Sequence, residues 1–355
     1  MRTPLRVLNS AVRNRLHMMV RPEVVTHLVT LRCNLKCMMC DVWKIKDYPE
    51  MNLEQIDKVY SDLGRLSVVR LSGGEPFLRK DMAEIINIVR ERSNPKYIQI
   101  NTNGMVQGRV IKTLEQVDCS NLHIKVSIDA MDETHDEVRG VQGSFNKTVD
   151  TLRQLVELRE RLGFYLGVHQ VIMRNTLQHI KPLRTLCDSL GLDLISEFAL
   201  DNQVLYEPSF EIKKVEQAMK TFDGLTPAEV EQAFSDMQTE SADDDLPERM
   251  MRRYYLEGAR NRLLKGVAKP NPPCVALGSH LRIMPNGNVP ICMYKPMVAG
   301  NLVDEGFEAL WKSARTEEFR NTEVRSCDGC WVGCEVQPNA IFSGDIVRAA
   351  FSRSA

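Results

Sequence analysis

The sequence predicts an α/β fold, in which an open, partial (β/α)6 TIM-like barrel precedes a small cysteine-rich C-terminal domain. Between residues 24 and 200, strand-like apolar runs alternate six times with segments of helical periodicity. Such alternation implies parallel strands, and six units are too few to close the eight-stranded barrel. Five of the ten cysteines lie between Cys274 and Cys334, which separates that region from the barrel.

The predicted strands span residues 24–30, 67–71, 97–101, 122–128, 164–173 and 193–199. After the first of them, Ile56, Val59 and Leu63 recur at helical spacing behind Asn52 and Gln55, which resemble a capping pair. We divide the chain into an N-terminal segment (1–23), the barrel (24–204), a helical connector (205–270), the cysteine-rich domain (271–336) and a C-terminal tail (337–355). A loop at residues 243–245 interrupts the connector, which could also cover the open barrel.

The composition excludes several classes of protein. The chain has 46 Lys and Arg residues against 47 Asp and Glu, so its charge gives no reason to expect nucleic acid as a partner. No apolar run approaches the roughly 18 residues of a transmembrane helix, and no signal peptide is recognisable. We therefore expect a cytoplasmic protein, in which clustered cysteines indicate metal or cluster ligands rather than disulfides.

The N-terminal segment mixes basic and apolar side chains in a pattern that fits a short amphipathic helix. Its basic residues are Arg2, Arg6, Arg13, Arg15 and Arg21. Two interpretations stay open. The helix packs on the domain, or it meets a partner or a membrane surface.

The most informative stretch directly follows the first predicted strand. Cys33, Cys37 and Cys40 are spaced C-x3-C-x2-C. Three thiolates cannot complete the four-cysteine set of a 4Fe–4S cubane, so one iron would stay open for another ligand. A zinc site and free core thiols are the alternatives.

This motif resembles the cluster motif of the radical S-adenosylmethionine (SAM) enzymes, in which the amino and carboxylate groups of SAM chelate the open iron. Gly73-Gly74-Glu75-Pro76, after the second strand, resembles the family motif that binds the SAM amino group. Its glycines let the main chain approach a ligand closely. The turn that contains Asn103, after the third strand, also resembles the family.

Residues after the fourth strand complete the implied SAM site. The resemblance implies that Ser127 and Arg139 hold the SAM carboxylate, and we include Asp129 among the cofactor-binding candidates. An arginine fork matches a carboxylate, although a surface ion pair is the alternative for Arg139. The chain departs from the family at Met39, where an aromatic residue often lies near the adenine. Trp43 could compensate or simply pack.

The C-terminal cysteines resemble an auxiliary-cluster domain of the SPASM/twitch type, with a zinc ribbon as the alternative. They are Cys274, Cys292, Cys327, Cys330 and Cys334. Because four thiolates ligate one cubane, we expect one auxiliary 4Fe–4S cluster and one spare thiol. The turn at residues 285–288 predicts a hairpin of residues 281–284 with residues 289–293.

The resemblance implies a radical SAM enzyme. A 4Fe–4S cluster on Cys33, Cys37 and Cys40 would reductively cleave SAM, and the 5′-deoxyadenosyl radical would abstract hydrogen from a small-molecule or peptide substrate. A one-electron donor such as flavodoxin or ferredoxin would supply the electron. Weaker substrate-site candidates are His169, Gln170, Glu197, Asp201 and Asn202.

Two further expectations concern the substrate and the alternative function. Many relatives that modify ribosomal peptides carry a leader-binding domain before the barrel. The short segment ahead of the first strand disfavours leader recognition in cis. The alternative is a non-catalytic zinc- or metal-binding interaction protein, in which Gly73–Pro76, Ser127 and Arg139 have no role.

Overall fold

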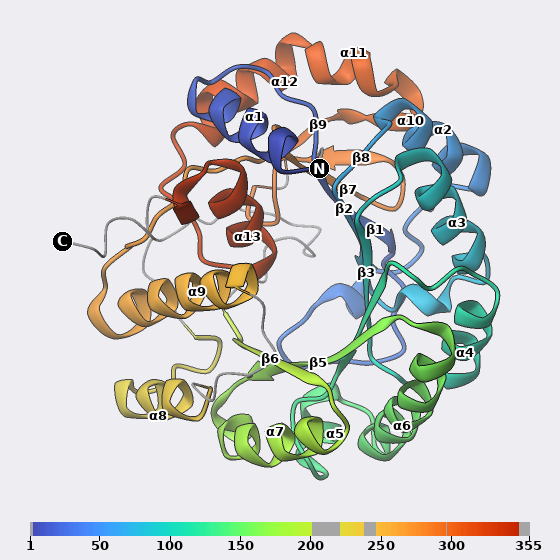
Figure 1. Ribbon diagram of the computed structural model, residues 1–355, viewed down its shortest axis with the longest axis vertical. Coiled ribbons are helices and arrows are strands. Elements are labelled where there is room, and N and C mark those ends of the chain that lie inside the picture. Colours follow the sequence, from blue (N-terminus) through green and yellow to red (C-terminus); the bar gives the residue numbers. More distant parts are fainter. Residues whose placement is uncertain (1–2, 201–220, 238–245, 296, 348–355) are drawn as a thin grey trace.

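The computed structural model describes residues 3–200, 221–237, 246–295 and 297–347. Parallel strands form one curved, seven-stranded sheet in the order β6-β5-β4-β3-β2-β1-β7 (Figure 1). The strands are β1 (Val24–Thr30), β2 (Val68–Gly73), β3 (Tyr97–Thr102), β4 (Leu122–Ser127), β5 (Tyr165–Ile172), β6 (Asp193–Phe198) and β7 (His280–Ile283). The predicted α/β architecture with six consecutive strand–helix units is therefore confirmed.

Helices cover the convex face of the sheet, as Figure 1 shows. They are α2 (Leu53–Leu63), α3 (Met82–Ser93), α4 (Gln107–Glu115), α5 (Thr134–Arg139), α6 (Ser144–Leu162) and α7 (Ile180–Ser189), with 3-10 turns η1 (Val42–Lys44), η2 (Pro76–Leu78) and η3 (Arg174–His179). The capping pair is present at α2, where Asn52 Oδ1 accepts a hydrogen bond from Gln55 N and Gln55 Oε1 accepts one from Asn52 N. This reciprocal pair satisfies two main-chain donors at the start of the helix.

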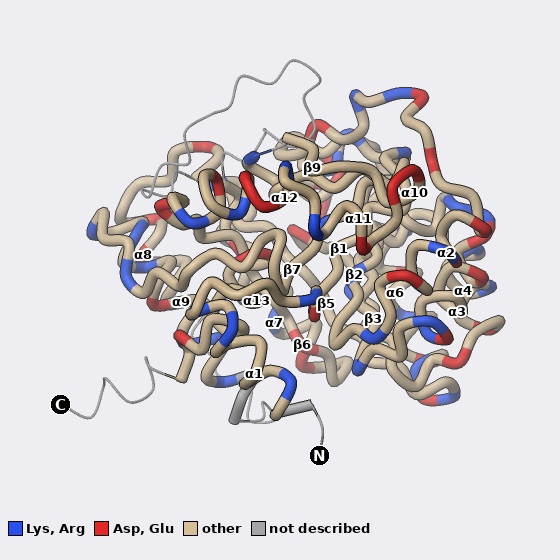
Figure 2. Tube along the Cα trace, turned by 90° about the horizontal axis from the view of Figure 1, so that it is seen from above, with Lys and Arg blue, Asp and Glu red and all other residues tan. Residues whose placement is uncertain are grey.

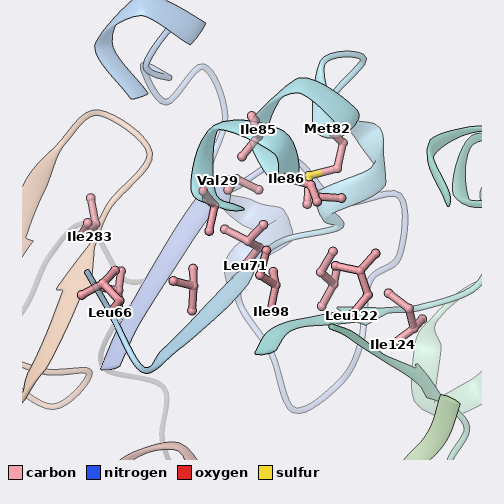
Figure 3. Close-up of a cluster of buried hydrophobic side chains, with 14 of the residues drawn as sticks. Val29, Leu66, Leu71, Met82, Ile85, Ile86, Ile98, Leu122, Ile124 and Ile283 are labelled. Atoms are coloured by element: carbon pink, nitrogen blue, oxygen red, sulfur yellow. The ribbon is translucent and has the colours of Figure 1, made fainter. Parts of the chain in front are cut away.

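The main core lies between these helices and the sheet. Figure 3 shows Leu71 and Ile98 of the strands facing Ile85 and Ile86 of α3. All four side chains are fully buried. Because side chains alternate along a strand, the residues between these apolar ones point to the concave side. That side therefore carries the more polar residues, among them Arg70, Lys125 and His169.

The seventh strand corrects one prediction. The predicted turn exists, since Gly287 N donates to Met284 O at 2.9 Å. However, β7 pairs in parallel with β1, while β8 (Asn288–Pro290) pairs with β9 (Val298–Asn301) in a separate antiparallel ladder. The predicted ladder of residues 281–284 with residues 289–293 is therefore absent from the described part of the chain, although Met284 N donates to Asn288 O at 2.8 Å across the turn.

The open side of the sheet is closed by segments from both ends of the chain (Figure 1). They comprise α1 (Thr3–Arg15), α8 (Pro227–Met237), α9 (Leu246–Lys265), α10 (Leu302–Glu305), α11 (Phe307–Lys312), α12 (Ala314–Phe319), the π-helical turn η4 (Arg320–Val324) and α13 (Gly333–Phe342). The rings of Tyr254 and Tyr255 stack on that of Trp331, which joins α9 to the segment before α13. The connector is thus helical where described, and the predicted loop at 243–245 lies outside the described residues. Within the described ranges, no helix is long and apolar enough to cross a membrane.

Candidate active site

The cysteine loop leaves the carboxyl end of β1 and is held on one side by the end of β2. Gly74 N donates to Thr30 O at 2.8 Å, and Glu75 N donates to Arg32 O at 2.9 Å. A Cβ atom on Gly73 would lie 2.0 Å from Thr30 O, and one on Gly74 would lie 2.2 Å from Arg32 O. The two glycines are therefore required for contact with the main chain of the cysteine loop, which the sequence did not reveal.

The other side of the loop rests on the end of α5. Lys36 N donates to Arg139 O at 2.9 Å, and Met38 N donates to Val138 O at 3.0 Å. Gly140 follows with a φ of 67°, and a Cβ atom there would lie 2.5 Å from Lys36 O. The loop is thus clamped from two sides by main-chain contacts that only glycine permits.

Three free, partly exposed thiols project from this clamped loop. Burial, together with the nearby thiolate charges, raises the pKa of Cys33 to about 11 and that of Cys40 to about 12. Such thiols hold a proton until a cation replaces it, as in metal binding. Among the described residues, no three His, Cys, Asp or Glu side chains gather around a single metal ion. The donor set of three soft thiols on a fixed loop fits an iron–sulfur cluster.

Arg139 lies beside these thiols in a buried ion pair. Its Nε atom donates to Asp129 Oδ2 at 2.6 Å, and Nη1 points to Cys37 Sγ at 3.9 Å. Asp129 Oδ1 also accepts a hydrogen bond from Val171 N. Burial opposes the charge of Arg139, but Asp129 and Cys37 keep its pKa above the usual value. Two predicted cofactor-binding residues therefore bind each other, with the guanidinium directed at a cluster ligand.

Glu75 and Asn103 join the neighbouring loops. The Glu75 carboxylate accepts hydrogen bonds from Phe77 N, Thr102 Oγ1 and Asn103 N at 2.7–3.2 Å. Burial raises the pKa of Glu75 to about 7 despite these donors. Asn103 Nδ2 in turn donates to Asn34 Oδ1 at 2.8 Å, which ties the loop after β3 to the cysteine loop.

The remaining predicted residues of the SAM site are distributed around the same edge. Ser127 ends β4 opposite His169 of β5. Met39 packs against Val138 and Met173, and the indole Nε1 of Trp43 is buried without a hydrogen-bond partner in the described part of the chain. Pro76 begins the 3-10 turn η2 and is buried.

The concave side of the sheet carries a charged group that faces the C-terminal domain. His169 Nε2 lies 3.5 Å from Glu197 Oε2. Burial raises the pKa of Glu197, but the charges of His169, Lys125 and Arg70 outweigh burial and hold this pKa below its usual value. A Cβ atom on Gly333 would lie 2.1 Å from Glu197 Oε1, so the C-terminal domain packs closely on this group.

One substrate candidate, Gln170, does not join that group. Gln170 is fully buried, where its Nε2 atom donates to Asp129 O and its Oε1 atom accepts from Ser196 Oγ. Its amide therefore connects the main chain at Asp129 to Ser196 of β6. Asp201 and Asn202 lie outside the described residues.

Electrostatic interactions link four of the five C-terminal cysteines, and the fifth, Cys334, lies beside Arg282 and Arg70. Burial raises the pKa of Cys330, and the charges of Glu335, Cys274, Cys292 and Cys327 raise it further, which indicates that those thiols lie close together. Cys334 instead lies near two arginines. Arg282 Nη2 is 3.8 Å from its Sγ atom, and Arg70 Nη1 donates to its carbonyl oxygen at 2.7 Å.

Sequence reasoning missed the buried network that supports Cys334. The Glu335 carboxylate accepts hydrogen bonds from Arg282 Nη2 at 2.6 Å and lies 2.9 Å from His280 Nδ1. Burial opposes ionisation, but His280 and Arg282 hold the pKa of Glu335 far below its usual value. No local spacing marks these residues, because they come together only when β7 joins the sheet.

Profiles of two protein families match the chain. Residues 28–181 match the "Radical SAM superfamily", and residues 274–331 match an "Iron-sulfur cluster-binding domain" named SPASM. Together these two regions cover more than half of the chain.

Curated relatives match this chain over different shares of its length. Pre-heme d1 synthase of Dinoroseobacter shibae is 32% identical over 178 residues, which are 49% of this chain and 42% of that protein. The AdoMet-dependent heme synthase of Methanosarcina barkeri is 26% identical over 84% of each protein. The chain thus spans about two fifths of the length of the first of these relatives.

Solved structures share the fold at low sequence identity. The enzyme anSMEcpe with bound AdoMet superimposes with a TM-score of 0.57 at 16% identity, over 93% of this chain and 100% of that one. Streptococcus suis SuiB bound to precursor peptide SuiA gives a TM-score of 0.60 at 14% identity, over 89% of this chain and 69% of that one.

The glycine clamp leads to a direct prediction. Gly74→Ala should destabilise the protein by about 1–3 kcal/mol, the usual cost of overpacking, because its Cβ atom meets the main chain at Arg32. Reconstituted protein should also lose iron at the cysteine loop. Gly108→Ala is the matched control, since a Cβ atom there meets nothing within 4 Å. Chemical denaturation and iron analysis measure both effects, and equal behaviour of the two variants would contradict the clamp.

The ion pair of Arg139 leads to a second prediction. Arg139→Ala leaves the Asp129 carboxylate buried and unpaired, which should cost about 3–5 kcal/mol. The double variant Asp129→Ala/Arg139→Ala should lose less than the sum of the single variants, because each single variant leaves one buried charge unpaired and the double variant leaves none. Denaturation of all four proteins gives the coupling energy, and strict additivity would rule out a structural pair.

Proposed function

Because the chain belongs to the radical SAM superfamily and carries a SPASM iron–sulfur domain, we propose that it is an enzyme that cleaves SAM reductively to start radical chemistry on a substrate. The observation that carries this proposal is the clamped loop after β1, with three free thiols beside Arg139. Fixed ligands on rigid elements suit a cofactor whose position must be exact to about half an ångström. The family supports binding of a 4Fe–4S cluster and SAM.

Cys33, Cys37 and Cys40 would hold the cluster, with SAM bound among the loops that carry Gly73–Pro76, Asn103, Ser127 and Asp129. When bound, these cofactors supply a one-electron cleavage of SAM and a 5′-deoxyadenosyl radical able to abstract hydrogen. Arg139, held by Asp129, keeps a positive charge next to Cys37 and so favours the thiolate form that binds iron. Arg139 could still direct its remaining N–H groups to the SAM carboxylate.

The substrate would bind on the concave side of the sheet. The charged group of Arg70, Lys125, His169 and Glu197 supports a small molecule or peptide with polar or ionised groups. Named relatives include heme synthases, GTP 3′,8-cyclases and a peptide maturation protein, so the family does not select one substrate. The close packing of Gly333 against Glu197 would exclude water from the reacting atoms.

The second group of thiols would hold one auxiliary cluster. We assign Cys274, Cys292, Cys327 and Cys330 as its ligands, because these thiols influence one another electrostatically. Cys334 is then the fifth, non-ligating thiol. A flavodoxin or ferredoxin of the cytoplasm would supply the electrons.

The central test is SAM cleavage. Anaerobically reconstituted protein with reductant and SAM should release 5′-deoxyadenosine, slowly even without substrate. The Cys33→Ala/Cys37→Ala/Cys40→Ala variant should lose this product while keeping about four irons at the auxiliary site. Chromatography of the nucleoside and iron analysis measure both. Unchanged release of 5′-deoxyadenosine by the variant would contradict the proposal.

The auxiliary ligand assignment predicts different effects at neighbouring cysteines. Cys334→Ser should keep the wild-type content of about eight irons, whereas Cys330→Ser should fall toward about four. Both substitutions replace a thiol by a hydroxyl, so each controls for the other. Loss of iron from Cys334→Ser with retention in Cys330→Ser would reverse the assignment.

A further inference from the structure

Helix α1 leaves an apolar face in solvent. Among the described residues, six of the nine most exposed large apolar side chains belong to α1 and the turn after it, with 46–68% of each side chain accessible. Leu5, Leu8, Val12 and Leu16 are three or four residues apart and share one face of the helix. We call these four residues the apolar stripe. Met18 and Met19 extend it beyond the helix.

The stripe does not hold α1 in place. The opposite face contains the buried Ser10 and Ala11. Asn14 Nδ2 donates to Phe342 O and to Ser279 Oγ, both at 2.8 Å, and thereby attaches α1 to α13 and to the segment before β7. The packing expected from the sequence is therefore present, and the stripe needs another explanation.

Positive charge borders the stripe, although Arg6 pairs with Glu23 and Arg21 pairs with Glu308. Residues 1–22 contain five arginines and no Asp or Glu, although the whole chain has a net charge of −1. At 3.6 residues per turn, Arg13 and Arg15 fall on opposite borders of the stripe. Figure 2 shows α1 at the edge of the described part of the molecule.

A basic pocket continues this surface. It has a volume of about 200 Å³ and lies between residues 17–20 and the segment from α11 to η4. Lys312, Arg320 and Arg325 line it, together with one carboxylate, Glu317. Arg320 Nη2 is buried there without a hydrogen-bond partner in the described part of the chain. The pocket thus offers cationic donors next to the apolar side chains.

We propose that α1 and the following turn bind the surface of an anionic phospholipid bilayer. A helix of 13 residues is too short to span a bilayer, but it can lie in the interface with an apolar stripe among the acyl chains and arginines at the phosphates. Leu and Val form the stripe, whereas protein interfaces favour Tyr and Trp at their centres. Since α1 precedes the amino end of β1, the cysteine loop at the other end of the strand faces away from the bilayer.

The test is co-sedimentation with vesicles of phosphatidylcholine alone or mixed equally with phosphatidylglycerol. The complete protein, with its clusters reconstituted, should bind the mixed vesicles, bind phosphatidylcholine weakly, and dissociate at high salt. Leu8→Glu should weaken binding about tenfold or more, because it puts a carboxylate into the stripe. Val267→Glu is the matched control, since Val267 is exposed elsewhere and should leave binding unchanged.

Folding and function are checked separately from binding. Both variants should keep the wild-type circular dichroism, iron content and release of 5′-deoxyadenosine, because neither residue lies near the cysteine loop. No binding of the wild type to mixed vesicles at low salt would overturn the proposal, as would equal binding by Leu8→Glu. Concentration-dependent dimers lost in Leu8→Glu, without vesicle binding, would instead assign the stripe to a second copy of the chain.

Discussion

The close approach of the chain at the carboxyl ends of β1 and β2 is the constraint on which the site depends. Adjacent strands are only about 4.8 Å apart, so the segments that leave them must pass each other in main-chain contact. Gly73 and Gly74 permit this contact, and Gly140 permits a similar one on the other side of the cysteine loop. A segment rich in potential metal ligands is thereby fixed by hydrogen bonds of its main chain, which leaves its thiols free for a cofactor.

Both groups of cysteines share a second arrangement. Arg139 lies 3.9 Å from Cys37 Sγ and is oriented by Asp129, while Arg282 lies 3.8 Å from Cys334 Sγ and is oriented by Glu335. In each case a buried carboxylate fixes a guanidinium beside a thiol. A fixed cation in a site of low dielectric lowers the cost of negative charge on sulfur. In both groups of cysteines, the fold therefore places a fixed positive charge beside a thiol.

The sequence predicted the parts of this structure that depend on local patterns. Strand-like apolar runs and helical periodicity located six strands and the capped start of α2, and cysteine spacing located the loop. The strand at residues 281–284 was predicted as one arm of a hairpin, but its pairing with β1 was missed because that partner is distant in the chain. Arg139 and Asp129 were predicted to bind SAM, and their mutual ion pair was not predicted because it depends on side-chain directions that spacing does not encode. Glu335, His280 and Arg282 were missed for the same reason.

The pairing of β7 with β1 has a consequence for how the protein forms. Thr26 and His280, which are hydrogen-bonded across this junction, are 254 residues apart in sequence. During synthesis, the edge of β1 that pairs with β7 therefore stays unpaired until most of the chain has left the ribosome. Unpaired strand edges favour aggregation. Contacts this distant also slow folding, because a long loop must close before they form. Yields of the intact protein should consequently respond to chaperones and slow expression more than its moderate size suggests.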